Sequence, residues 1–282
     1  MLPQQVQLSS QDFARIRSML YRAAGIALGD GKQALVAGRL HRRLDAVGVT
    51  TYAGYIDHIE APGHATELQF AIDLLTTNET YFWREPQNFD LLTEQAREAG
   101  RARRPFSVWS AASSSGEEAY TLAMLLEQVA EAERGLSWRI VGSDISTRVL
   151  ERARTGHYPM DRAAQLPPEL LRRYCLKGQG QHEGSLLVTS KLRERVSFQQ
   201  VNLIEAMPAI GPFDAIFLRN VLIYFDAETK ARVLESVASR LVPGGRLFVG
   251  LSESVRSLPA GLLQDRPAVY RRPARQAQAV AS

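Results

Sequence analysis

The sequence is poor in cysteine and has no long apolar run. Cys175 is the single cysteine among 282 residues, which excludes an internal disulfide and is typical of a reducing cytoplasm. No stretch approaches the roughly 20 apolar residues that a membrane span needs. The N-terminus, MLPQQVQLSS, lacks the basic and apolar regions of a secretory signal. We therefore expect a cytoplasmic protein without direct membrane insertion.

The sequence also lacks a strong excess of charge. Lysine and arginine total 34 and aspartate and glutamate total 30, a formal net charge of +4. This balance permits acidic partners but does not by itself indicate nucleic-acid binding. With 45% hydrophobic residues, the chain can bury a substantial core, so we expect a globular protein of more than one domain.

The first 75 residues show a series of helical patterns. Ser9 or Ser10 can cap a helix that Gly25 ends. Its apolar face consists of Phe13, Ile16, Met19, Leu20 and Ala23. The pattern predicts further helices over 32–46, 52–59 and 64–75. In the first of these, the residues expected to point inward are Leu35, Leu40 and Leu44. We predict an all-helical N-terminal domain, with no strand before residue 105.

After Pro105, short apolar runs alternate with helical patterns. The predicted strands are 106–110, 139–143, 195–201, 213–218 and 245–251. The predicted helices between them are 117–134, 146–154 and 227–241. This alternation predicts a mostly parallel sheet, and hence an α/β domain over 105–272 that binds ligands at the carboxyl ends of its strands.

One connection in this domain is too long for a simple crossover. It contains KGQGQHEGSLLVTSKL, which is typical of a turn between short strands, so we predict a small antiparallel β subdomain inserted at about 157–194. Residues 76–104 are predicted to be a linker helix that contributes to the ligand site. Residues 273–282 have no apolar period, and we expect a flexible tail there.

The stretch 108–124, VWSAASSSGEEAYTLAM, has the outline of a nucleotide-binding turn between a strand and a helix. Small residues from Ala111 to Ser115 let a ligand lie against the backbone. Glu117 and Glu118 stand where such turns normally offer bare N–H groups to phosphate. These acids can simply complement the helix dipole, an effect of roughly 0.3–1 kcal/mol. Beside the small residues, they favour a phosphate-free ligand with hydroxyls and positive charge, such as S-adenosylmethionine.

Polar residues follow two of the predicted strands. Asp144 comes after RIVGS, and an acid at this strand end commonly receives ribose hydroxyls, although it can instead cap the next helix. In FDAIFLRNVLIYF, 213–225, the strand ends in Arg219 and Asn220, with Tyr224 shortly after. Because the carboxyl ends of parallel strands face the ligand, we expect these residues at the same site.

Further polar residues lie in TTNETYFWRE, 76–85, where the two domains join. Asn78, Thr80 and Arg84 share a face if the segment is helical, and Phe82 and Trp83 could wall a pocket at the domain boundary. The same residues are equally typical of a helix cap, core aromatics and a solvated charge. From the segment alone, both interpretations stay open.

Together these motifs resemble the chemotaxis receptor methyltransferases of the CheR type. The similarity covers nearly the whole chain, in the order TNETYFWRE, VWSAASSSGEEAY, GSDIS, GQGQHEG, VNL, FDAIFLRNVLIYF and LVPGGRLFVGLSES. Each motif is a modest match, but their order and spacing are specific. The family often has histidine in a GHSE-like turn, where this chain reads GLSES with Leu251, which places a role for that turn in question.

The resemblance implies a Rossmann-like, S-adenosylmethionine-dependent O-methyltransferase. It would methylate glutamate side chains on the cytoplasmic helical bundle of chemoreceptors, for sensory adaptation, and release S-adenosylhomocysteine. Carried over position by position, the implied cofactor contacts are Asn78, Thr80, Arg84, Ala111, Glu117, Asp144, Asn202, Leu203, Arg219 and Asn220. Tyr224 occupies the aromatic position close to the transferred methyl group.

Methyl transfer to glutamate needs no general base, because glutamate has a pKa of about 4.3 and is already ionised at neutral pH. None of the five histidines lies at a recognised strand-end site, and no metal is expected. Arg84 and Tyr224 are therefore expected to orient the cofactor and the acceptor without transferring protons.

The implied receptor contacts involve two further parts of the chain. In the second helix, Arg39 and Arg43 are one turn apart, beside Lys32 and Arg42. Such charges are normally a solvated face, but the resemblance suggests that they steer the enzyme to an acidic receptor bundle. In the inserted unit, the glycines expected to serve a turn, or to admit a receptor C-terminal peptide by strand addition, are Gly178, Gly180 and Gly184.

Two other functions are weighed against this one. A nucleic-acid methyltransferase is suggested by the isoelectric point of about 9.3, but the chain lacks a proline-aromatic acceptor motif and a basic-aromatic platform. A non-catalytic cofactor-binding signalling module is disfavoured by the intact Arg84, Glu117, Asp144 and Arg219–Asn220 positions. We expect a monomer recruited to membrane receptor arrays.

Overall fold

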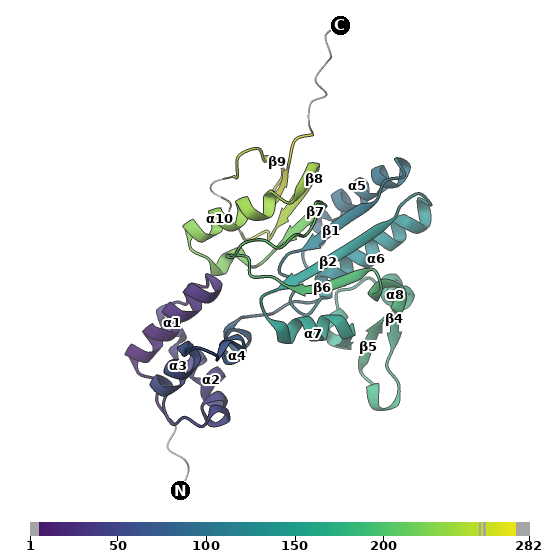
Figure 1. The fold of residues 1–282 in the computed structure, drawn as a ribbon. Coiled ribbons are helices and arrows are strands. Elements are labelled where there is room, and N and C mark those ends of the chain that lie inside the picture. The colour runs from purple at the N-terminus through teal and green to yellow at the C-terminus, as the bar shows by residue number, and fades with distance from the viewer. Residues whose placement is uncertain (1–5, 254, 256–257, 275–282) are drawn as a thin grey trace.

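The computed structural model describes residues 6–253, 255 and 258–274 (Figure 1). The N-terminal part is helical, and its helices are α1 (Ser10–Ala24), η1 (Asp30–Lys32), α2 (Gln33–Val47), α3 (Tyr52–Glu60) and α4 (Ala65–Leu75). They pack around one apolar core that includes residues from all four α-helices. The predicted helical region is confirmed, and the described residues before 105 contain no strand.

Helix α1 begins and ends as the sequence predicts. The Ser9 side chain accepts a hydrogen bond from the backbone N–H of Asp12, and Gly25 ends the helix with a φ of 70°. A serine cap satisfies an N–H group that has no partner within the helix, and glycine adopts the left-handed conformation without steric cost. Phe13 and Ile16 lie on its buried face.

One inward residue of α2 was predicted wrongly. Val36, Leu40 and Leu44 are buried, at a spacing of four residues, whereas Leu35 is 38% exposed. Since consecutive residues of a helix point about 100° apart, a face centred on Val36 and Leu40 leaves Leu35 at its edge. Leu35 instead lines the large cavity described below.

The second part of the chain contains a seven-stranded sheet with strand order β6-β2-β1-β7-β8-β10-β9. Its strands are β1 (Phe106–Ser110), β2 (Trp138–Asp144), β6 (Val196–Gln200), β7 (Phe213–Leu218), β8 (Leu241–Val249), β9 (Leu263–Arg266) and β10 (Val269–Arg271). The first five pair in parallel, whereas β10 is antiparallel to β8 and β9. The chain fills the sheet outward from β1 in one direction, then from β7 in the other, so the order reverses between β1 and β7. Ligands of open α/β sheets bind at such a switch point.

Helices cover both faces of this sheet (Figure 1). The long ones are α5 (Phe89–Arg101), α6 (Glu117–Ala132), α7 (Thr147–Thr155) and α10 (Ala227–Ala238). Along β1, Val108 belongs to the apolar core that includes α5 and α6, and Trp109 belongs to the core that includes α10. This alternation is what a strand buried on both faces requires. The predicted α/β fold with a mostly parallel sheet is confirmed.

The inserted β subdomain is also confirmed as a separate antiparallel sheet. Its strands are β3 (His157–Pro159), β4 (Cys175–Lys177) and β5 (Ser185–Val188), in the order β3-β5-β4. Two short helices not predicted from the sequence, α8 (Pro168–Tyr174) and α9 (Ser190–Arg193), flank β4 and β5. Strand β4 therefore lies at an edge of this small sheet.

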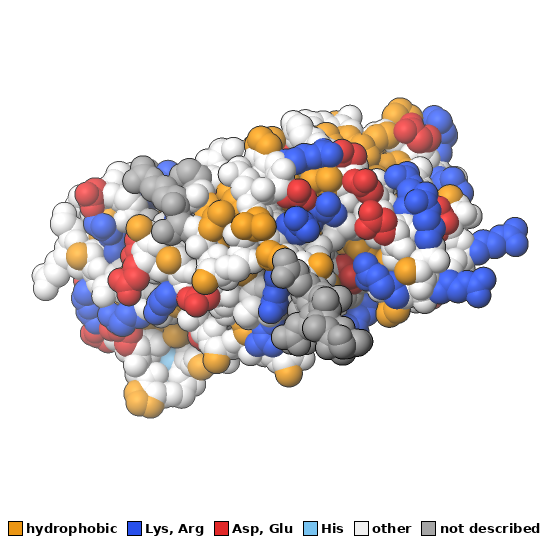
Figure 2. Space-filling view, turned by 90° about the horizontal axis from the view of Figure 1, so that it is seen from above, with side chains coloured by type: hydrophobic (Ala, Val, Ile, Leu, Met, Phe, Trp, Pro, Cys, Tyr) orange, Lys and Arg blue, Asp and Glu red, His pale blue; other side chains and the backbone are white. Residues whose placement is uncertain are grey.

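The C-terminal region differs from the prediction at β10. This strand, with β9, was not predicted, and backbone bonds join Arg272 to Gly244 and Gly245. Most of the tail expected at 273–282 lies outside the described residues. On the face of the molecule seen in Figure 2, basic and acidic side chains are interspersed. Within the described ranges, no helix is both long and apolar enough to cross a bilayer.

Candidate functional site

A cavity of about 390 Å³ lies where the helical domain meets the carboxyl ends of the central strands. The segment from Ala24 to Leu35 supplies one wall, and residues 75–84 supply another. The ends of β1, β2 and β7 close the remainder. The predicted residues that line it are Asn78, Thr80, Arg84, Ala111, Asp144, Asn202, Leu203, Arg219, Asn220 and Tyr224. Segments more than 100 residues apart in sequence therefore meet at one site.

The turn after β1 has two residues in the left-handed conformation, and one of them packs closely on α7. Gly116 precedes α6 with a φ of 96°, and a Cβ added there would lie 2.9 Å from the Cβ of Ala153. Ser114, with a φ of 48°, also adopts the left-handed conformation. Glycine tolerates this conformation readily, whereas serine does so only when its surroundings hold it.

The acid that lines the cavity is Glu118, not Glu117 as predicted. Glu117 is buried behind the turn, where its carboxylate accepts a hydrogen bond from the Ser115 hydroxyl at 2.7 Å. Glu118 accepts a hydrogen bond from Ser110 Oγ at 2.7 Å and pairs with Arg219 at 3.2 Å. Burial raises the pKa of the Glu118 carboxyl, against the opposing charge of Arg219.

Asp144 ties the ends of two neighbouring strands together. Its Oδ2 accepts the backbone N–H of Ser114 at 2.9 Å, and its Oδ1 accepts that of Ser146 at 3.0 Å. Burial raises the pKa of the Asp144 carboxyl to about 6, although these hydrogen bonds oppose the shift. A buried carboxylate with remaining acceptor capacity at the cavity wall can receive ligand hydroxyls.

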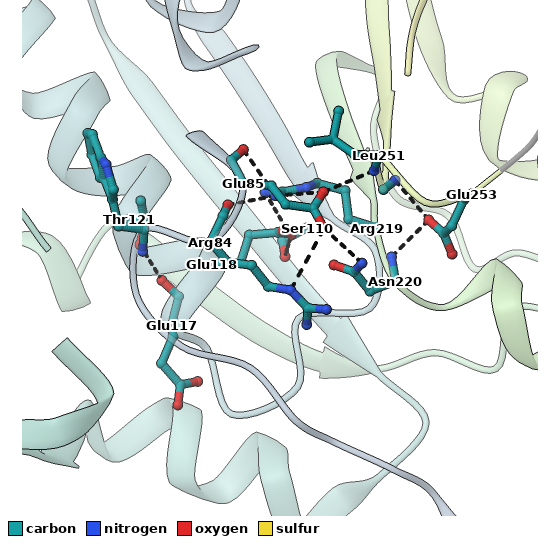
Figure 3. Close-up of polar contacts among 12 residues, drawn as sticks. Arg84, Glu85, Ser110, Glu117, Glu118, Thr121, Arg219, Asn220, Leu251 and Glu253 are labelled. Atoms are coloured by element: carbon teal, nitrogen blue, oxygen red, sulfur yellow. Dashed lines mark hydrogen bonds and ion pairs between the residues drawn. The ribbon is translucent and has the colours of Figure 1, made fainter. Parts of the chain in front are cut away.

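Arg219 and Asn220 lie in a polar network at the end of β7 (Figure 3). Arg219 donates to the carbonyl oxygen of Arg84 at 2.6 Å and pairs with the Glu85 carboxylate at 3.3 Å. Asn220 Nδ2 also donates to Glu85, at 3.1 Å, and the Leu251 N–H donates to it at 3.0 Å. Although burial opposes the change, these donors and Arg219 lower the pKa of Glu85.

Glu253 belongs to the same network and was missed by sequence reasoning. Its carboxylate accepts the backbone N–H groups of Asn220 at 2.8 Å, Gly250 at 2.8 Å and Ile223 at 3.3 Å. The GLSES turn, whose role was in question because of Leu251, thus holds the residues that follow β7. The available signal for Glu253 was an acid four residues after the end of β8, whereas the signal for Glu85 was only its position beside Arg84.

The segment from Thr77 to Glu85 is not helical, contrary to the prediction. It is irregular, with a turn at Phe82–Trp83, and the helix of this region, α5, starts only at Phe89. Phe82 is fully buried against Tyr158, and Trp83 packs on Phe89. Phe89, rather than Phe82 or Trp83, lines the cavity.

Arg39 and Arg43 are both engaged within the helical domain. Arg39 donates to the carbonyl oxygen of Leu75 at 2.9 Å, which closes the end of α4. Arg43 forms a two-point ion pair with the buried Glu67, including an Nε contact of 2.9 Å. Both guanidinium groups therefore have partners within the helical domain, and their role in steering toward an acidic receptor bundle stays a prediction.

The three glycines of the inserted subdomain have two different roles. A Cβ on Gly178 would lie 1.9 Å from the His182 carbonyl oxygen, so this glycine serves the close approach of the hairpin's own backbone. Gly180 and Gly184 have positive φ values of 57° and 77°. Both therefore shape the turn between β4 and β5, as their default interpretation predicts.

Comparison with known proteins assigns the chain to a family. The description "CheR methyltransferase, SAM binding domain" matches residues 78–264, and "CheR methyltransferase, all-alpha domain" matches residues 11–76. The chain belongs to the CheR methyltransferase family. Residues of both matched regions line the cavity.

Several chemotaxis protein methyltransferases are similar to this CheR-family chain over most of its length. The protein from Salmonella typhimurium is 42% identical over 258 residues, which cover 91% of this chain and 88% of the relative. Chemotaxis protein methyltransferase 2 of Pseudomonas aeruginosa is 42% identical, over 89% of each chain. The protein from Klebsiella aerogenes is 43% identical over 95% of this chain and 92% of its own length.

The cavity of this CheR methyltransferase fits S-adenosylmethionine by its chemistry. Its volume is within the range of small-molecule sites. Asp144 is placed to accept hydroxyls, Glu118 and Glu79 bring negative charge toward an ammonium and a sulfonium, and Arg84 can meet a carboxylate. The N-terminus of α6 carries Glu117 and Glu118 beside its backbone N–H groups, and their negative charge favours a nucleoside without phosphate.

Proposed function

We propose that the protein is an S-adenosylmethionine-dependent protein-glutamate O-methyltransferase. Its acceptors are glutamate side chains on the cytoplasmic helices of chemotaxis receptors, and its products are glutamate methyl esters and S-adenosylhomocysteine. The observation that carries the proposal is the similarity to chemotaxis protein methyltransferases over nine-tenths of the chain. The role that follows is sensory adaptation, performed by a cytoplasmic monomer at membrane receptor arrays.

In the proposed reaction, the main task of the protein is to position the reacting groups rather than to transfer protons. The bound cofactor supplies a methyl group on a positively charged sulfur. An ordinary glutamate is ionised at neutral pH, so the acceptor needs no base. Because its charge is neutralised as the new bond forms, strong stabilisation of that charge would slow the step. In-line alignment within a cavity that excludes water supplies most of the rate.

Tyr224 and Arg84 are proposed to provide this alignment. Tyr224 lines the cavity, and its carbonyl oxygen accepts the backbone N–H of Ala27 at 2.9 Å. Glu253 holds the start of the same turn through Ile223. Arg84 is oriented by its bond to the Glu79 carbonyl oxygen at 3.0 Å. The Arg84 side chain and the Tyr224 backbone are thereby held by neighbours, which supports a role in orientation without proton transfer.

The receptor bundle is proposed to contact the protein at helix α2 and at η1, which directly precedes it. Lys32, at the cavity rim, and Arg42 are exposed, and they are the cations of this region that remain open to a partner. Arg39 and Arg43 contribute by fixing the helix rather than by touching the receptor. Exposed cations steer an acidic partner and mainly increase its rate of association.

A receptor C-terminal peptide is proposed to add to the edge of strand β4. Gly178 donates its N–H to Ser185, and Tyr174 accepts from Thr189. Because partners alternate along an antiparallel pair, the N–H of Lys177 points away from β5, whereas the N–H of Cys175 donates to the Leu171 carbonyl oxygen at the end of α8. An extended peptide could pair with this edge by strand addition.

The competing functions fit the molecule less well. A nucleic-acid methyltransferase would benefit from a continuous basic field, whereas the face in Figure 2 has charges of both signs interspersed. A non-catalytic module would not need the acids and arginines of the cavity to be mutually positioned. Neither alternative accounts for the similarity to chemotaxis protein methyltransferases along the whole chain.

The test is a methyl-transfer assay with radiolabelled S-adenosylmethionine on receptor-containing membranes, followed by mild alkali. We expect label on receptor that alkali releases as methanol, since carboxyl methyl esters hydrolyse readily. Parallel samples contain receptor with the acceptor glutamates replaced by alanine, and nucleic acid in place of receptor. Alkali-stable label, or label on nucleic acid alone, would contradict the proposal.

A further inference from the structure

Asp73, near the end of helix α4, is a buried carboxylate of the helical domain that bonds the other domain. It is 3% exposed. Its Oδ1 accepts the backbone N–H of Thr147 at 3.0 Å, and its Oδ2 accepts the Thr147 hydroxyl at 2.8 Å and the N–H of Arg148 at 3.3 Å. The Arg148 guanidinium in turn donates to the Asp73 carbonyl oxygen at 3.0 Å.

These contacts make Asp73 the cap of helix α7. The first N–H groups of a helix have no partner inside it, and a side chain from the preceding residue normally accepts them. Here the preceding residue, Ser146, makes no such bond, and its hydroxyl is buried without a partner. The capping oxygen therefore comes from another domain, 74 residues away in sequence.

The capped turn is the one that carries Asp144. Asp144 bonds the N–H of Ser146, and Asp73 bonds the N–H of the next residue, Thr147. A second contact from α4 supports the same turn, because Gln69 donates to the Ile145 carbonyl oxygen at 3.0 Å and to Asp73 at 2.8 Å. Asp144 and Ile145 both line the cavity, whereas Asp73 and Gln69 do not.

We propose that Asp73 is a positioning residue for the cofactor cavity, which acts by holding the Asp144 turn from the helical domain. Without Asp73, the N–H groups of Thr147 and Arg148 lose their acceptor inside a buried region, which is unfavourable. Asp144 is then the nearest carboxylate on the same turn, and any rotation toward these groups withdraws it from the cavity wall. Docking of the helical domain and binding of the cofactor are therefore coupled. This inference rests on the cofactor assignment above.

The experiment measures S-adenosylhomocysteine affinity by calorimetry, together with the melting temperature, for wild type, Asp73→Ala, Asp73→Asn and Thr51→Ala. Thr51 is the matched control, because it caps helix α3 within the helical domain through the N–H of Gly54 and does not line the cavity. We expect Asp73→Ala to weaken binding about 5- to 100-fold, the usual range for coupled sites. Asp73→Asn, which keeps one acceptor oxygen, should lie between Asp73→Ala and wild type.

Thr51→Ala should lower the melting temperature yet leave affinity within about twofold, because it removes a helix cap that does not contact the cavity. If Asp73→Ala does not fold, the comparison of Asp73→Asn with Thr51→Ala decides. Affinity of the Asp73 variants within twofold of wild type, or equal weakening by Thr51→Ala, would overturn the inference. Wild-type protein that binds no S-adenosylhomocysteine would instead contradict the cofactor assignment.

Discussion

At the scale of single residues, the cavity depends on carboxylates that have lost most of their solvent. Asp144 is the clearest case, because burial raises its pKa to about 6, close to physiological pH. If ligand hydroxyls bond the ionised carboxylate, protonation competes with binding. The dissociation constant of S-adenosylhomocysteine should then rise below pH 6, by up to tenfold for each pH unit.

This prediction is checked by calorimetric titrations from pH 5 to pH 8, with Asp144→Asn as the control variant. The variant should bind about 10- to 100-fold more weakly at pH 8, the equivalent of about 1.5–3 kcal/mol for a charged hydrogen bond, and its affinity should not change across this range. An unchanged wild-type affinity at pH 5 would contradict the assignment.

Unfolding of the protein caused by protonation of Asp144 cannot explain a loss of S-adenosylhomocysteine affinity at low pH. Its pKa is higher in the folded protein than in the unfolded chain, so the folded state holds the proton more tightly. The stability that protonation contributes is complete below about pH 4 and is lost as the pH rises through 6. Acidification from about pH 6 to pH 4 therefore increases the contribution of Asp144 to the stability of the fold, while it weakens the binding of the ligand.

The choice between Glu117 and Glu118 shows where sequence reasoning ends at this scale. The motif indicated acids at the start of α6, but neighbouring helical residues point about 100° apart. Which one faces the cavity depends on how α6 packs, and that is set by contacts with α5 and the sheet. The location of the strand-end residues was easier to predict, since the carboxyl ends of parallel strands face the ligand site. These residues are Asp144, Arg219 and Asn220.

At the scale of elements, the sequence predicts best where hydrophobic periodicity is long or caps are clear. Strands β1 and β7 occupy the predicted ranges, and α1 has its predicted cap. The prediction for the segment from Thr77 to Glu85 was wrong because its polar spacing suits a helix, while tertiary bonds to Arg219 and Ser114 hold it in an irregular conformation. Strand β10 has only three residues, too few for a periodic signal.

Strand β4 carries a prediction of its own. Lys177→Pro removes one outward N–H from the free edge while the bonds from β4 to β5 remain. With a receptor that ends in a docking peptide, the KM for receptor should rise about five- to tenfold, and kcat and S-adenosylhomocysteine affinity should not change.

The matched variant for this experiment is Lys177→Ala, which keeps the N–H and loses the same charge. Steady-state kinetics on receptor with and without its C-terminal segment separate the effects. An identical KM for the proline and alanine variants would show that this edge does not bind the receptor.

At the scale of the whole molecule, residues of two domains line the cofactor cavity, and a single segment connects these domains. Residues from Ala24 to Lys32 supply a wall, although they precede the sheet by more than 70 residues. The sequence indicated a site at the domain boundary, but not that the end of α1 and η1 would contribute to it. That contribution depends on docking contacts such as Asn202 to the Ala23 carbonyl oxygen at 2.7 Å.

Ligand binding should therefore protect both domains from hydrogen exchange. At S-adenosylhomocysteine concentrations of 100 times the dissociation constant, amides over residues 24–32 should exchange up to about 100-fold more slowly. Helix α3 does not line the cavity and should be protected less. Exchange mass spectrometry with and without ligand measures this, and protection confined to residues 105–272 would contradict it.

The acidic start of α6 has a consequence for the cell in which the enzyme works. ATP and its breakdown products share an adenosine group with the cofactor and are abundant. Their phosphates would meet the Glu118 carboxylate beside the first N–H groups of α6, and the like charge opposes their binding. We therefore expect little competition from ATP, so the rate of receptor modification should follow the supply of methyl donor and the removal of its demethylated product.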